Sequence, residues 1–269
     1  PDQDLQVTAD FDSRNGALVI DTLALHSGDS DLIVQGTIER PSDLQVALDI
    51  VGTRLNLDPW VDALRKRNDT KSKRDQRATD NRYVLPDYPI STEWLSHFSA
   101  DVDLQIDELG GMHRPVFNVQ GAFTMGNSGI LIERLSAENE RSGGATLTGS
   151  LLSRPETAPQ FDIAIEGSEL VLGIPKAPLE DINSLPSYEF RSKFSGEGTT
   201  TRKLASNLDG YLNVVMGSGK VLNAGFDRLT NSFLQELSET LNPLQSQQED
   251  TSINCAAAFV AVENGKLSG

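Results

Sequence analysis

The sequence contains little cysteine, few aromatic residues and no long hydrophobic run. Its single cysteine, Cys255, excludes an internal disulfide and leaves the redox compartment open. Aromatic residues make up only 6% of the chain, so thick core layers built on rings are not expected. No stretch approaches the roughly 18–20 apolar residues that a bilayer-spanning helix needs. The chain begins in mid-pattern at "DLQVTADF" without a signal peptide, which suggests an excised fragment.

Basic residues are also scarce relative to acidic ones, and the formal net charge is -16. Binding to nucleic acid depends on basic side chains that neutralise phosphates, so nucleic acid is not an expected partner. The same charge disfavours electrostatic docking on an anionic membrane surface. It leaves open binding to the apolar part of a lipid.

Catalytic and cofactor motifs are missing as well. The stretch Gly217–Lys220 resembles a phosphate-binding loop, but Val214 and Val221 occupy the places of its first glycine and its Ser/Thr. We therefore interpret it as a turn that joins two strands. The three histidines are isolated from one another, and no nucleophile elbow or dinucleotide loop is present. We expect neither an enzyme nor a bound cofactor or metal.

What the sequence does contain is alternation of apolar and polar residues, which is typical of strands with one buried face. Leu5, Val7, Ala9 and Phe11 alternate with polar residues. The same pattern recurs at residues 32–38, 44–50, 102–106, 117–123, 145–151, 161–165, 212–216 and 253–261. We predict a mainly β protein: a long curled antiparallel sheet with one solvated face.

The in-phase apolar residues are predicted to line the other face. The last alternating run places Cys255 on this face together with Phe259, where a thiol serves as packing. The predicted lining residues are Val119, Phe123, Leu147, Leu151, Ile163, Ile165, Val214, Met216 and Phe259.

An internal repeat supports a sheet made of similar units. The segment Gly16–Pro41 resembles Gly129–Pro155, and each is followed by another alternating strand. Neighbouring units of this kind share one continuous sheet.

Helical patterns are few. "LDPWVDALRKR" predicts a short helix capped by Asp58, "STEWLSHFS" predicts a helical turn, and residues 224–241 predict an amphipathic helix. The densely charged segment Arg65–Asn81 is interpreted as a linker. We divide the chain into a first β portion (1–58), a helix with the charged loop (59–89) and a second β portion (90–269).

Three stretches together resemble the bacterial AsmA family. They are "ISTEWLSHFSADVDLQIDEL", "FSGEGTTTRKLASNLDGYLNVVMGSGKV" and "TSINCAAAFVAVENGKLSG", and the similarity extends over most of residues 1–58 and 90–269. The charged insertion does not fit the family's pattern. The resemblance implies a periplasmic protein, anchored in the inner membrane by an N-terminal helix not present in this sequence. It also implies a curled sheet with an apolar interior and a role in phospholipid transport between the two membranes.

Two architectures remain open. About a dozen strands at roughly 4.7–4.9 Å spacing form a sheet on the order of 55 Å long, and such sheets tend to curl. With few helices to cover it, the apolar face either folds on itself or leaves a U-shaped groove, which we favour. The groove predicts a module that binds phospholipid acyl chains. A self-filled sheet predicts a non-catalytic scaffold that affects assembly of outer-membrane proteins or lipopolysaccharide.

Overall fold

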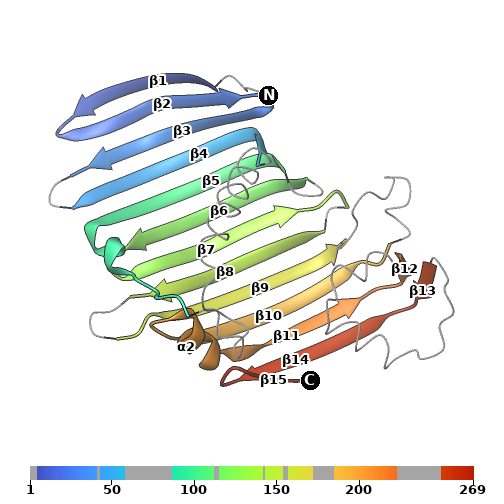
Figure 1. Ribbon diagram of the computed structural model, residues 1–269. Helices are drawn as coiled ribbons and strands as arrows, with labels where there is room; N and C mark the ends of the chain where they lie inside the picture. Colours follow the sequence, from blue (N-terminus) through green and yellow to red (C-terminus); the bar gives the residue numbers. More distant parts are fainter. Residues whose placement is uncertain are drawn as a thin grey trace, which may run out of the picture.

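The computed structural model describes residues 5–40, 43–57, 87–111, 115–141, 143–153, 157–171, 185–222 and 250–269. Strands dominate these ranges (Figure 1). The strands of the N-terminal half are β1 (Leu5–Arg14), β2 (Ala17–Ser27), β3 (Ser30–Glu39), β4 (Leu44–Asn56), β5 (Phe98–Gly110), β6 (Val116–Gly126) and β7 (Gly129–Glu138). The others are β8 (Gly144–Leu152), β9 (Gln160–Leu170), β10 (Tyr188–Glu197), β11 (Asp209–Met216), β12 (Gly219–Leu222), β13 (Asp250–Ile253), β14 (Ala256–Glu263) and β15 (Lys266–Ser268).

One 13-stranded sheet contains all of these strands except β12 and β13. Strand order follows the chain from β1 to β11 and continues to β14 and β15, so the two ends never meet and the sheet stays open. This confirms the predicted fold class, a long, mainly antiparallel sheet. Strands from both predicted β portions pair with each other within it.

The pairing of β4 with β5 departs from the antiparallel prediction. These strands run parallel, with Leu44 opposite Phe98 and Asn56 opposite Gly110. A parallel pair needs a connection of about a dozen residues or more, and Leu57 and Glu93 are far enough apart in sequence to supply one. The charged segment Arg65–Asn81 and the helix predicted at Asp58 both fall in this connection and lie outside the described residues.

The internal repeat corresponds to a repeated three-strand unit. Residues of Gly16–Pro41 form the hairpin β2–β3, which pairs with β4, and residues of Gly129–Pro155 form the hairpin β7–β8, which pairs with β9. The turns differ: Gly28 and Asp29 join β2 to β3, whereas residues 139–143 join β7 to β8. The sequence similarity therefore reflects equivalent positions in one sheet.

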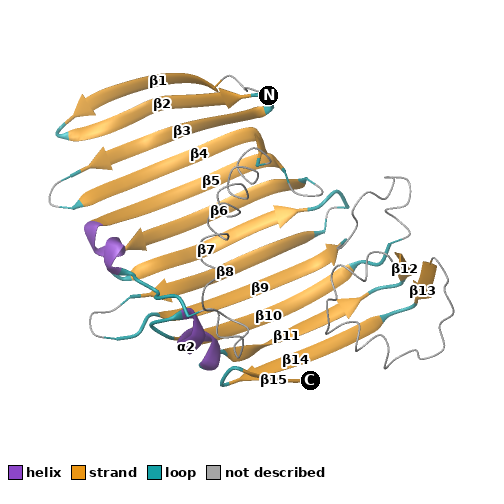
Figure 2. Ribbon diagram, viewed as in Figure 1, coloured by secondary structure: helices purple, strands orange, loops and turns teal. Residues whose placement is uncertain are grey.

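Few helices accompany the sheet in the described ranges (Figure 2). The predicted turn is a 3-10 helix, η1 (Glu93–His97), and its Leu95 is fully buried. A second helix, α2 (Thr201–Ser206), was not predicted; the Thr200 side chain accepts a hydrogen bond from the Lys203 amide at its start. The amphipathic helix predicted at residues 224–241 lies outside the described residues. No helix in the described part of the chain is long and apolar enough to span a membrane.

The stretch that resembles a phosphate loop is a strand, a turn and a second strand, as predicted. Strand β11 leads through Gly217 and Ser218 into β12. The two strands do not pair with each other: β11 lies between β10 and β14, while β12 pairs with β13 in a separate two-stranded sheet.

Candidate functional site

The strand pairing places most apolar residues on one face of the 13-stranded sheet. Directly paired residues share a face, so the register traces continuous rows across the strands. Two adjacent rows extend from β1 to β14 without a single charged residue, and we call this side of the sheet the apolar face. The first apolar row is Ala9, Leu23, Val34, Ile50, Leu104, Gly121, Leu135, Leu147, Ile165, Ser192, Leu212 and Val260. The second is Phe11, Ile20, Gly36, Leu48, Val102, Phe123, Ile132, Gly149, Ile163, Phe194, Gly210 and Val262.

Eight of the nine residues predicted to line this face do lie on it. Leu147 and Ile165 pair directly in the first row, and Phe123 and Ile163 belong to the second. The other four continue the face along β6, β8 and β11. They are Val119, Leu151, Val214 and Met216.

The face predicted for Phe259 is wrong. This residue pairs with Asn213, while its neighbour Val260 pairs with Leu212 in the first row, so Phe259 points to the opposite face. There it is 58% exposed and stacks on Tyr211 with ring centroids 6.4 Å apart. Cys255, predicted to pack on the apolar face in phase with Phe259, is exposed. The cause is that β14 is apolar on both sides, so its alternation does not reveal which side is inward.

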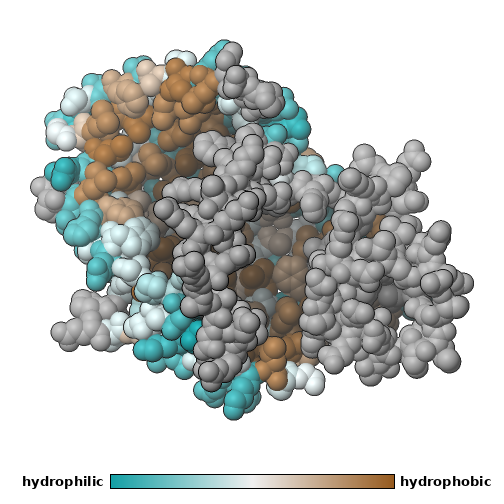
Figure 3. Space-filling model, viewed as in Figure 1, coloured by the Kyte–Doolittle hydropathy of each residue, from teal (hydrophilic) through white to brown (hydrophobic). Residues whose placement is uncertain are grey.

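Burial changes along the apolar face. In the middle, Ile106 and Val119 pair with each other and are only 2% and 4% exposed. At the β1 end, Val7 and Phe11 are 54% and 49% exposed. Most lining residues between these extremes are half-buried. A space-filling view shows apolar side chains gathered over β1–β4 and again over the last strands, with polar residues at the strand ends (Figure 3).

The residues between the apolar rows point the other way and form the polar face. Cross-strand ion pairs join its strands, among them Arg191 with Glu166 at 3.1 Å and Lys193 with Asp162 at 3.8 Å. All four side chains are about half exposed or more, so solvent screens these pairs.

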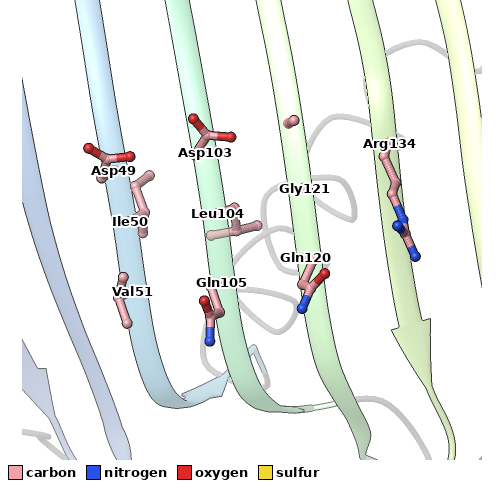
Figure 4. Close-up of a pocket in the computed structure, with 10 residues that line it drawn as sticks. Asp49, Ile50, Val51, Asp103, Leu104, Gln105, Gln120, Gly121 and Arg134 are labelled. Atoms are coloured by element: carbon pink, nitrogen blue, oxygen red, sulfur yellow. The ribbon is translucent and has the colours of Figure 1, made fainter.

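The polar face also carries a depression of about 390 Å³. Asp49 and Asp103, paired on β4 and β5, lie side by side, and Arg134 on β7 borders the depression (Figure 4). Ala122 on β6 pairs with Asp103 on one side and with Arg134 on the other, so its short side chain leaves room between longer polar ones. We do not assign ligand binding to it, because exposed, solvated carboxylates lack the buried environment that tunes a site. Within the described residues, no group of His, Cys, Asp and Glu is arranged to hold a metal ion.

Four ionisable groups among the described residues have shifted pKa values: the exposed ion pair Asp12 and Arg14, and also Asp31 and Tyr188. The hydroxyl of Thr53 donates to the Asp31 carboxylate at 2.6 Å, and with the backbone amides of Thr53 and Arg54 it lowers the pKa of Asp31. These bonds hold β3 to β4 where their register shifts. Burial raises the pKa of Tyr188, which pairs with Met216 on the apolar side of β10. Asp31 has a structural role, and the Tyr188 phenol stays uncharged at neutral pH.

The chain matches no protein-family model, no curated protein and no solved structure. The resemblance to the AsmA family therefore stands on the sequence stretches quoted above alone.

Proposed function

We propose that this chain binds the acyl chains of phospholipids along its apolar face. The observation that carries the proposal is the pair of charge-free rows that cross the sheet without interruption. Each methylene that leaves water for such a surface contributes about 0.8 kcal/mol. A continuous apolar strip also offers a chain many equivalent positions along its length.

Partial exposure of the face supports a ligand rather than a closed core. In the interior of a packed domain, large apolar side chains are nearly all buried. Here Leu5, Val7 and Phe11 at one end are about half exposed or more, and most of the central residues are half-buried. An elongated apolar ligand gains affinity by covering such side chains.

The wider role follows from the resemblance to the AsmA family. In this proposal the chain acts in the periplasm, anchored to the inner membrane through an N-terminal helix of a longer protein. There it contributes to lipid transport between the inner and outer membranes and so to outer-membrane homeostasis. The polar strand ends would leave a phospholipid head group in water.

A scaffold is the second candidate function, and one observation favours it. On the polar face, Val215 is 39% exposed and lies near the stacked pair of Tyr211 and Phe259. Such apolar side chains exposed near one another are typical of protein contacts. A non-catalytic periplasmic scaffold would use this surface to affect outer-membrane protein or lipopolysaccharide assembly.

Native mass spectrometry of protein purified from the periplasm of a Gram-negative host tests the proposal. We expect copurified phospholipid in the wild type and a loss of it in Leu147→Arg on the apolar face. Thr148→Arg, which places the same charge on the polar face one residue away, is the matched control and should retain the lipid. A lipid-free wild-type protein would contradict the proposal and favour the scaffold.

A further inference from the structure

Two phenylalanine rings on the apolar face lie directly over glycines. A Cβ atom placed on Gly121 would come within 2.5 Å of Cε2 and 2.8 Å of Cζ of Phe123. A Cβ atom on Gly167 would come within 2.6 Å of Cε1 and 2.8 Å of Cζ of Phe190. Ordinary contacts of a Cβ atom begin at about 3.4 Å, so neither ring leaves room for a side chain beneath it.

The backbone conformation does not require glycine at either of these two positions. Neither Gly121 nor Gly167 has the positive φ that favours glycine over other residues. Gly210, by contrast, has a φ of +154°. At Gly121 and Gly167 the missing side chain therefore makes space for the ring.

The two pairs reach the same arrangement by different routes. Phe123 lies two residues beyond Gly121 on β6, so the ring folds back along its own strand. Phe190 on β10 lies directly opposite Gly167 on β9, so the ring crosses to the neighbouring strand. In both cases the ring lies along the sheet instead of standing away from it.

We propose that these two glycine–phenylalanine pairs set the depth of the acyl-chain site. This inference rests on the proposed function. A ring that lies over a glycine leaves the space above the sheet free for a hydrocarbon chain. A Cβ atom beneath it would push the ring tip outward by about 1 Å, because the backbone blocks movement in the other direction. Phe123 and Phe190 thus determine how thick a chain the face accepts at β6 and at β9–β10.

A purely structural role makes a different prediction. Aromatic rings stabilise strand glycines by covering their backbone, with no involvement of a ligand. In that case the methyl group of an alanine at the glycine position would cover the backbone in place of the ring, and ligand affinity would not change.

Binding of cis-parinaric acid, a naturally fluorescent fatty acid, to the purified chain distinguishes the two roles. We expect Gly121→Ala and Gly167→Ala each to raise Kd about tenfold, equivalent to losing contact with about two methylene groups. Removing the ring as well should restore binding, so Gly121→Ala/Phe123→Leu and Gly167→Ala/Phe190→Leu should bind within about threefold of wild type. Gly110→Ala is the matched control, since its Cβ atom would meet nothing nearer than 3.9 Å.

Thermal unfolding is followed in parallel. Only flexible side-chain ends must move, namely the two rings and the Leu170 methyl that lies 2.7 Å from the Gly167 position. The midpoint should therefore stay within about 4 °C of wild type. Unchanged affinity in the alanine variants would overturn this inference alone, as would a loss of affinity that the double variants do not restore. A wild-type chain that fails to bind the fatty acid would overturn the proposed function and this inference with it.

Discussion

The two faces of the sheet are made by the same strands, yet they differ in what they contribute. The polar face carries cross-strand ion pairs such as Arg191 with Glu166, whose side chains are 66% and 64% exposed. Exposed pairs of this kind stabilise a protein by about 0–1 kcal/mol. The apolar face carries two rows free of charge and the buried pair Ile106–Val119. Burial on this side is therefore the main source of stability.

If the apolar face binds a hydrocarbon ligand as proposed, stability and binding compete for one surface. An apolar face that is only half-buried stabilises the sheet less than a closed core would, since the hydrophobic contribution scales with the area removed from water. We infer that the remaining exposure is what a hydrocarbon ligand uses. The same substitution should therefore change stability by different amounts on the two faces.

The largest difference is expected for one substitution made on both faces. Val119→Asn removes a buried side chain and leaves an amide without partners, which should cost about 3 kcal/mol. Val51→Asn, at a position that is 48% exposed on the polar face, should change stability by less than about 0.5 kcal/mol. Urea unfolding at neutral pH measures both, and equal losses would show that the faces are not distinct.

A smaller effect is expected at Leu147, which is half-buried. In an open site, the chain of Leu147→Arg can extend along the face and place its charge in water, so stability should fall by about 1–2 kcal/mol. Leu131→Arg on the exposed polar face should be close to neutral. If Leu147→Arg instead unfolds the protein, the charge is trapped without a partner, and the face is a closed core.

The stability that Asp31 contributes is expected to depend on pH. The pKa of Asp31 is lowered in the fold, chiefly by the Thr53 hydroxyl, so its stabilisation is present above the ordinary value of 3.8. This stabilisation is lost progressively as pH falls below 3.8 and then passes through the lowered pKa that Asp31 has in the folded protein. Asp31→Asn should cost about 1 kcal/mol at pH 7 and progressively less below pH 3.8. Asp29→Asn in the neighbouring turn is the control, and a pH-independent loss in Asp31→Asn would show that charge is not involved.

The smallest effect is expected from the ion pairs of the polar face. Glu166→Gln removes the partner of Arg191, and because both groups are largely exposed, unfolding free energy should change by less than about 0.5 kcal/mol. Added salt should reduce the difference further. A loss above about 1 kcal/mol would mean that this face contributes more than the comparison allows.

The alternation of the sequence predicted the sheet and eight of nine residues on its apolar face because charged residues occupy the other side of most strands. It failed in β14, "AAAFVAVE", where both sides are apolar and only pairing with β11 orients Phe259. It also could not predict that β4 and β5 are parallel, because strand direction is set by a long connection. Helix α2 was missed because six residues are too few for a helical pattern.

The glycine–phenylalanine pairs show a further limit of the sequence. "GAF" at Gly121 hints at the first pair, since residues two apart share a face of a strand. Nothing in the sequence indicates the second, because Gly167 and Phe190 meet only through the pairing of β9 with β10.

Photo-crosslinking at two adjacent positions tests the central claim most directly. A photoreactive amino acid at Leu147 faces the apolar side of β8, and the same amino acid at Thr148 faces the polar side. If phospholipid binds the apolar face, irradiation in cells should yield a lipid adduct at position 147 and none at position 148. Adducts at neither position, or at both equally, would contradict the account.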